Sequence, residues 1–310
     1  MKWKLLLLSA FLLSACQSND SEKLSSSNYT NPLFTKNYKF SYPNDSAFTE
    51  FIDGLSSVRQ HINKEYSASE NEYFCNVDFK EYFKIFDKLH VAPNWKLESY
   101  YYAPGGGGRP VFIAFEKNDI VGDRIYHMLH DSVRTVNPTP VLSNDLAEEI
   151  FKYNGSINYL NSIEIADNPM GYFQFVVFAL IGDNYCLFWH SNYSELEIIT
   201  SKEQLLKLTK RKNDFYYKFS KKDKNSPTPT EPNPNELHWS DNTMDIDRVL
   251  QIDPSPIVTI GKDAVEVSIV TLGPWEGFIS RTYSISKSFP HVLTPIKSDT
   301  LIPYHCGIMF

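Results

Sequence analysis

Three residues within five positions, His127, His130 and Asp131, have side chains that bind metals or transfer protons. The two histidines are three apart in "HMLHD", and residues three apart on a helix share a face. A zinc site in an enzyme needs a third protein ligand and an open position. His190 and His305 are available as third ligands, and the sequence places neither beside the pair. We interpret the cluster as surface histidines and keep a hydrolase that uses His127, His130 and Asp131, with or without a metal, as the alternative.

Four consecutive glycines precede Arg109, and such a segment could bring backbone N–H groups close to a phosphate. A P-loop continues from its glycines through Lys and Ser/Thr into a helix. Here Arg109-Pro110 opens a strand-like run instead. The segment is therefore predicted to be a hairpin turn without a bound nucleotide.

Other catalytic patterns are missing from the sequence. It contains no Gly-x-Ser-x-Gly nucleophile elbow. Glu148 and Glu149 are adjacent on an expected helix, so they point in different directions and do not form a carboxylate pair. We expect no cofactor and no bound metal.

The secondary-structure elements that would position these residues predict an α+β fold. Apolar residues at helical spacing predict amphipathic helices over 45–66 and 77–90, with shorter helices over 121–134 and 144–152. A capping-box pattern, Ser201 with Gln204, predicts a further helix start. Asp45 or Ser46 would cap the first helix and Asn76 the second.

Strand-like runs fill the remainder. The runs 95–103 and 109–117 flank the glycines and predict a hairpin. The most apolar run predicts two buried strands, Tyr172–Leu180 and Tyr185–His190, around a Gly-Asp-Asn turn. Further strands are expected at 195–200, 257–261, 264–273 and 277–286. We therefore expect N-terminal amphipathic helices packed on a mainly antiparallel sheet, followed by a β-rich C-terminal region.

The first sixteen residues indicate where in the cell the protein is located. Lys2 and Lys4 precede a nine-residue apolar run, about half the length that spans a bilayer but enough for a secretory signal. Leu13-Ser14-Ala15-Cys16 resembles the lipobox of bacterial lipoproteins, which implies that Cys16 is acylated and becomes the mature N-terminus. Gln17, where enterobacterial lipoproteins retained at the inner membrane have Asp, favours the outer membrane. The resemblance implies a chain anchored to the envelope and not spanning it.

Composition divides the rest of the chain. Residues 1–15 are expected to be a signal peptide, and residues 16–40, rich in Ser and Asn, a lipidated flexible tether. Four prolines and no other apolar residue mark 221–236 as a linker or long loop. It separates an expected α+β domain, 41–220, from a β-rich region, 237–310.

Three cysteines, Cys75, Cys186 and Cys306, remain beyond Cys16. An odd number permits at most one internal disulfide, which an oxidising envelope would allow. Cys186 lies in the apolar run "NYCLFWH", where we interpret it as a buried free thiol. The sequence leaves the pairing of the three open.

Charge and composition favour a binding protein. The formal charge is −7, and it becomes −9 when the signal peptide with its two lysines is removed, so we expect no nucleic-acid partner. Aromatic residues make up 15% of the chain, and Tyr and Trp often anchor protein interfaces. We therefore expect a non-catalytic envelope lipoprotein with a protein partner, for example an immunity-type lipoprotein. A structural role at the outer membrane and the hydrolase remain as alternatives.

Overall fold

The computed structural model describes residues 45–67, 77–103, 107–132, 144–154, 158–189, 191, 196–210, 244 and 246–304. The expected signal peptide, tether and linker lie outside these residues, as do Cys16, Cys75 and Cys306. The fold is α+β with antiparallel sheets and a β-rich C-terminal region, as the sequence predicts. Its elements are α2 (Asp45–Ser67), α3 (Phe79–Phe83), β1 (Leu89–Val91), β2 (Trp95–Tyr102), β3 (Gly107–Glu116), α4 (Ile120–Ser132), α5 (Asn144–Asn154), a 3-10 turn (Tyr159–Ser162), β4 (Ile163–Ile165), α6 (Pro169–Ile181), β5 (Phe188–Trp189), β6 (Glu197–Ile199), helical residues 202–210, α8 (Ile246–Leu250), β7 (Ile257–Ile260), β8 (Ala264–Gly273), β9 (Gly277–Ser286) and β10 (Leu293–Ile302).

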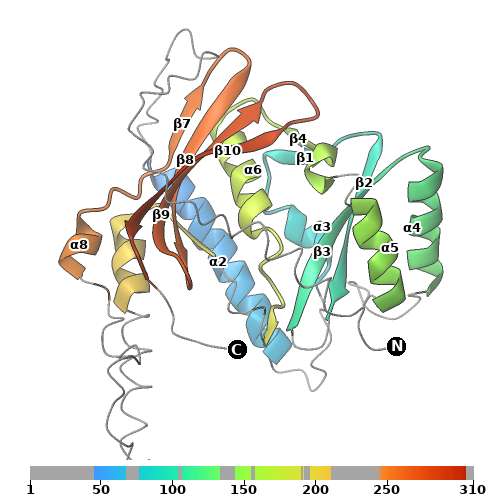
Figure 1. Cartoon of the computed structure of the whole chain (residues 1–310), viewed down its shortest axis with the longest axis horizontal. Coiled ribbons are helices and arrows are strands. Elements are labelled where there is room, and N and C mark those ends of the chain that lie inside the picture. The colour runs from blue at the N-terminus through green and yellow to red at the C-terminus, as the bar shows by residue number, and fades with distance from the viewer. Residues whose placement is uncertain are drawn as a thin grey trace, which may run out of the picture.

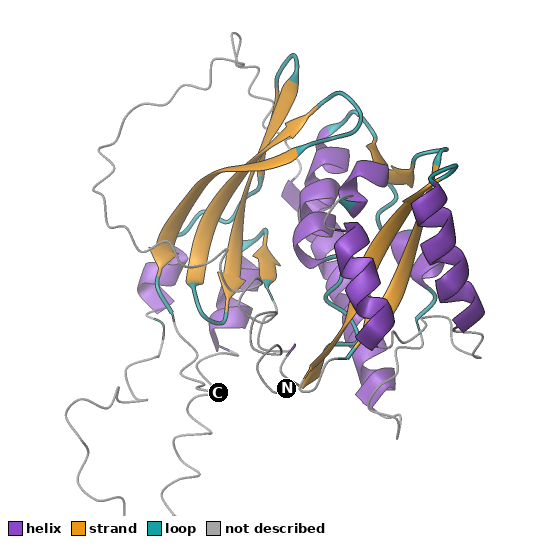
Figure 2. Ribbon diagram, turned by 45° about the vertical axis from the view of Figure 1, so that its right-hand side comes forward, coloured by secondary structure: helices purple, strands orange, loops and turns teal. Residues whose placement is uncertain are grey.

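Helices and sheets alternate across the molecule. The sheet β10-β9-β8-β6, with β7 also paired to β8, lies on one side of α2 and α6, and the sheet β2-β3-β5 lies on the other (Figures 1 and 2). Helices α4 and α5 cover the outer face of β2 and β3. Helical residues 202–210 and α8 lie against the far face of the C-terminal sheet near its lower end in Figure 1. One buried cluster runs through the centre and joins residues from α2, α6, β3, β8 and β9.

Helix α6 corrects the sequence prediction for this segment. The run expected as a strand, Tyr172–Leu180, is helical from Pro169 to Ile181. Asn168 caps the helix, accepting the N–H of Gly171 at 2.9 Å, and Pro169 occupies its first turn. Because both large sheets contact it, its sequence is apolar on every side and shows no helical period. Among the described residues, no helix combines the length and apolarity needed to cross a membrane.

Of the second expected strand of this run, Tyr185–His190, the structure describes residues 185–189, and among these only the two residues of β5 form a strand. The turn between the two segments, residues 182–184, forms as expected. The helix expected over 77–90 is also shorter than predicted. It covers Phe79–Phe83, is capped by Asp78 in place of Asn76, and gives way to β1 at Leu89.

The glycine-rich hairpin is confirmed: β2 and β3 pair antiparallel, with Tyr102 opposite Arg109. Its side chains alternate between the central core, which takes Leu97 and Tyr101, and the α4–α5 side, which takes Tyr100. A Cβ on Gly108 would lie 2.2 Å from the Tyr101 hydroxyl. This glycine is therefore needed for close packing against Tyr101.

The C-terminal sheet contains the four expected strands: the short strand β6 and the strands β7, β8 and β9. The turn between β8 and β9 uses Gly277 at φ +85°, a conformation that favours glycine. An edge strand, β10, was not anticipated from the sequence. Seven of its residues, from Thr294 to Thr300, are exposed, so they show no apolar alternation. Pro295 and Lys297 on this edge are residues that discourage pairing with another strand.

Most aromatic residues in the described part of the chain lie in the core. The Phe112 and Phe178 rings stack at 5.1 Å and link β3 to α6, and the Phe48 and Phe173 rings are 4.5 Å apart and link α2 to α6. Among the described residues, the exposed large aromatic side chains are Phe151 and Phe289. Most aromatic side chains in the described part of the chain therefore serve packing.

Candidate functional site

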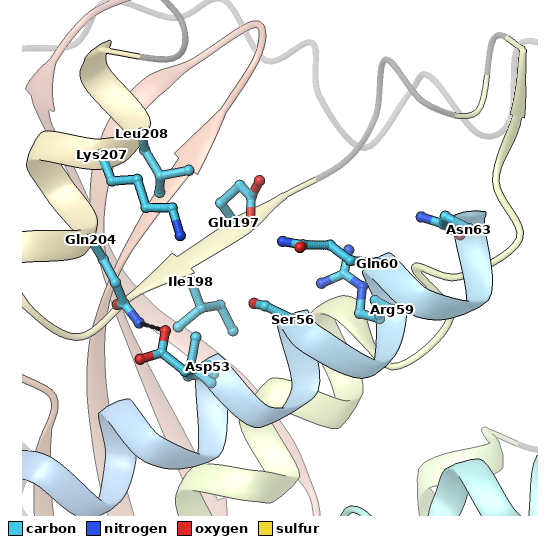
Figure 3. Close-up of a pocket in the computed structure, with 11 residues that line it drawn as sticks. Asp53, Ser56, Arg59, Gln60, Asn63, Glu197, Ile198, Gln204, Lys207 and Leu208 are labelled. Carbon is cyan, nitrogen blue, oxygen red and sulfur yellow. Dashed lines mark hydrogen bonds between the residues drawn. The ribbon is translucent and has the colours of Figure 1, made fainter. Parts of the chain in front are cut away.

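A groove lies between α2 and helical residues 202–210, with β6 beneath it (Figure 3). Its volume is about 120 Å3. Each of these three elements contributes one apolar side chain, and the other lining side chains are polar. The lining residues are Ile52, Asp53, Ser56, Arg59, Gln60, Asn63, Glu197, Ile198, Gln204, Lys207 and Leu208.

Helix α2 supplies the first wall because it is amphipathic. One side of the helix packs Phe48, Ile52 and Leu55 into the core. Polar residues at positions 53, 56, 60 and 63 recur at spacings of three and four, so they form a stripe along the helix beside the apolar side. The polar ends of Ser56 and Gln60 point into the space between the two helices (Figure 3). The stripe is the polar wall of the groove.

A hydrogen-bond network fixes one end of the groove. The Gln204 Oε1 accepts the backbone N–H of Thr200 at 2.8 Å and its hydroxyl at 3.0 Å. The Gln204 Nε2 donates to an Asp53 carboxylate oxygen at 2.8 Å. The Thr200 hydroxyl also meets the hydroxyl of Thr49 on α2 at 2.9 Å. One half of the predicted capping box is confirmed, because the Ser201 hydroxyl accepts the backbone N–H of Gln204. The bonds to Thr200 and Asp53 orient the side-chain amide of Gln204 beside the groove.

Arg59 and Asn63 form the other end. Arg59 is only 5% exposed, and its Nε donates to the backbone carbonyl of Asn184. Asn63 accepts the N–H of Cys186 at 3.0 Å with its side-chain oxygen, which leaves its amide nitrogen turned toward the groove (Figure 3). Residues 184–186 and α2 therefore hold each other in place, and the polar side chains at this end are oriented in advance.

A partly buried polar region adjoins Arg59. Burial raises the pKa of the Asp183 carboxyl above its usual range, and Arg109, 3.5 Å away, and Arg59 offset this only in part. Burial likewise raises the pKa of the Tyr82 hydroxyl, which with the Asn184 amide nitrogen finds no hydrogen-bond partner among the described residues. This region thus contains polar groups that burial disfavours in their charged forms.

The groove combines features suited to recognition. Lys207 and Arg59 are cationic, Asp53 and Glu197 are anionic, and the amides of Gln60 and Asn63 both donate and accept hydrogen bonds. A peptide segment presents alternating donors and acceptors along its backbone, together with polar side chains. The groove therefore offers hydrogen-bond donors, hydrogen-bond acceptors and charges of both signs, on side chains from α2, β6 and residues 202–210.

The residues singled out from the sequence lie elsewhere. His127, His130 and Asp131 are on α4, on the far side of the β2–β3 sheet from the groove, and the His127 side chain is exposed. The side chains of His130 and Asp131 lie outside the described ones. Within the described part of the chain, no group of three or more His, Cys, Asp or Glu residues is placed to hold a metal ion.

Cys186 requires a correction. It is 1% exposed, as expected, but it forms a disulfide and is not a free thiol. Its partner lies outside the described residues and is one of Cys16, Cys75 and Cys306, the other cysteines of the chain. Apolar neighbours in the sequence indicate that a cysteine is buried, but they do not distinguish a free thiol from a disulfide-bonded cysteine. The prediction of a free thiol was wrong for this reason.

Comparison with protein family models, curated proteins and solved structures finds no match to this chain.

Proposed function

We propose that this chain is a non-catalytic binding protein of the bacterial cell envelope, anchored by a lipid on Cys16, which recognises a polar segment of a partner protein. The groove between α2 and residues 202–210 is its binding site. The observation that carries the proposal is the oriented set of amide and charged side chains at both ends of this groove. An immunity-type role, in which the partner is a toxin, is one form of this function.

Two observations support the compartment. The lipobox-like segment ending at Cys16 follows a short apolar run, as in proteins that are exported and acylated. The disulfide at Cys186 is a feature of proteins in oxidising compartments such as the bacterial periplasm. The two observations are independent, since one concerns the N-terminus and the other the core.

Site-specific photo-crosslinking in the cell tests the binding site. A photoreactive amino acid at Gln60 or Lys207 should form one adduct of defined mass with a partner protein, which mass spectrometry identifies. The same amino acid at Glu50 or Glu203, exposed positions on the same two helices outside the groove, is the matched control. Equal adducts at all four positions, or none at Gln60 and Lys207, would contradict the proposal.

Membrane fractionation tests the anchor. The Cys16→Ser variant should not be acylated and should leave the membrane fraction on extraction that retains the wild type. A variant that fractionates as the wild type does would show that the chain is not held by a lipid at this residue.

A further inference from the structure

The tip of the β9–β10 hairpin presents apolar side chains to solvent. Phe289 is 44% exposed and Val292 is 55% exposed, and only His291 in this tip is buried among its neighbours. The tip of the β7–β8 hairpin lies beside it, joined by the bond from the Lys287 N–H to the Asp263 carbonyl at 2.9 Å. Both tips project at the same end of the molecule (Figures 1 and 2).

This tip is fastened to the body of the protein. His291 Nδ1 lies 2.8 Å from the Ser286 carbonyl and its Nε2 3.3 Å from the backbone nitrogen of Ile165 in β4. Since a carbonyl only accepts and an N–H only donates, Nδ1 carries the proton and Nε2 accepts. Lys287 pairs with Asp167 at 3.1 Å. A tip held by these contacts has little freedom to fold Phe289 and Val292 back onto the core.

We propose that Phe289 and Val292 insert into the surface of the lipid bilayer to which the N-terminal lipid attaches the chain. The inference rests on the anchored binding protein proposed above. It adds a second contact with the membrane, which would set the orientation of the groove relative to the bilayer.

A lipid surface fits this tip better than a protein surface does. The hairpin tip that carries these two exposed residues lies at one end of the molecule (Figure 1), and a bilayer can receive a protruding tip without complementary pockets. Lys262 and Asp263 are both exposed in the adjacent tip, so their formal charges cancel and leave no net negative charge there to repel an anionic headgroup layer. Residues 17–44 between Cys16 and α2 span at most about 100 Å when extended, so a lipid on Cys16 keeps the tip near the bilayer. At the high effective concentration that a tether gives, insertion of two side chains is sufficient for a lasting contact.

Vesicle partition of the unacylated mature chain tests the tip independently of the anchor. Residues 16–310 with Cys16→Ser are mixed with vesicles of phosphatidylethanolamine and phosphatidylglycerol and sedimented. We expect weak but measurable binding, which the double variant Phe289→Ser/Val292→Ser lowers at least about tenfold because two apolar side chains no longer leave water. Hydrogen exchange of the amides of residues 287–292 should slow when vesicles are added, and this slowing should be lost in the double variant.

A matched control separates the tip from general hydrophobicity. Ile120 and Val121 on α4 are 86% and 49% exposed, and Ile120→Ser/Val121→Ser should leave partition unchanged. Equal losses in the two double variants, or no slowing of exchange at 287–292, would overturn the proposal, as would tip-dependent self-association without vesicles. The two experiments also distinguish this proposal from the proposed lipid anchor. If the lipid anchor were wrong, the wild-type chain would leave the membrane fraction, while the unacylated chain would still bind vesicles through the tip.

Discussion

The side-chain amide of Gln204 donates to the carboxylate of Asp53 at 2.8 Å, although 151 positions separate the two residues in the sequence. This bond joins residues 202–210 to α2 across one end of the groove (Figure 3). Because the oxygen of the same amide is already bound to Thr200, the nitrogen can only point toward α2 or the groove. One glutamine therefore connects the start of its own helix to the opposite wall of the binding site.

A double-mutant cycle should measure this connection. Asp53→Ala and Gln204→Ala should each lower the free energy of unfolding, Gln204→Ala by about 1 kcal/mol because it also removes the bonds to Thr200. The coupling energy between them should be about 0.5–1 kcal/mol, since the bond is exposed to solvent. Urea denaturation of the four proteins gives these values, with Glu203→Ala as the control. A coupling energy near zero would mean that the bond does not hold the two walls together.

Gly54 is predicted to be a site of easy stabilisation. It lies within α2, is exposed, and a Cβ added there would have no atom within 4 Å. Gly54→Ala should raise the free energy of unfolding by about 0.5–1 kcal/mol because alanine restricts the unfolded chain and favours the helix. Gly277→Ala is the opposite case, since it combines positive φ with a Cβ that would lie 2.1 Å from the Ile302 carbonyl. Thermal melts should move in opposite directions, and a lower melting temperature for Gly54→Ala would contradict the argument.

Asp183 should make stability depend on pH. Burial raises its pKa in the folded chain above the usual value of about 3.8, so the folded state binds the proton more tightly than the unfolded state does. Stability from this group is therefore full below the unfolded pKa and is lost as pH rises through the folded pKa. The free energy of unfolding of Asp183→Asn minus that of the wild type should therefore be larger at pH 7 than at pH 4. Urea titrations at both pH values measure the difference, and Asp263→Asn, at an exposed turn, controls for loss of a charge.

The disulfide of Cys186 should contribute strongly to stability. Closing a loop of about 100 residues corresponds to roughly 5 kcal/mol in the chain-entropy model. If Cys16 carries the lipid, the partner is Cys75 or Cys306, and mutating that one to Ser should reproduce the loss seen in Cys186→Ser. Peptide mapping without reductant identifies the pair. A variant series in which neither Cys75→Ser nor Cys306→Ser changes stability would exclude both partners.

Local pattern predicted the elements that have one solvent face. The sequence shows the period of helix α2, of the first half of β8 and of the second half of β9, because one side of each is exposed or half-buried. Helix α6 does not, since sheets on both sides make every position apolar. Its helical character was encoded instead by Asn168 and Pro169, the cap and first residue, which precede the apolar run. The sequence pattern did not predict strand β10, for the opposite reason. Most of its residues are exposed, so they show no alternation of apolar and polar side chains.

The groove could be predicted only in part. The stripe of Asp53, Ser56, Gln60 and Asn63 is visible as a polar face at helical spacing, and nothing local distinguishes it from an ordinary solvated face. Its partners Glu197 and Gln204 come beside it only because β6 pairs with β8 and α2 packs close to β6. Contacts over such sequence separations depend on the tertiary fold and carry no local signature.

The shared core leads to a prediction about the expected β-rich region, residues 237–310. Val265, Val267 and Ile269 of β8 are buried against α2 and α6, and β6 from the preceding part of the chain pairs with the end of β8. An isolated 237–310 fragment would expose this face to water and lose a neighbour of β8, at a cost of apolar burial that its remaining contacts do not offset. We therefore expect the fragment alone to be unfolded or aggregated, while co-expression with residues 41–220 should restore a folded complex. Nuclear magnetic resonance of the labelled fragment makes the comparison: a dispersed amide spectrum from the fragment alone would show that it folds independently and can bind without α2.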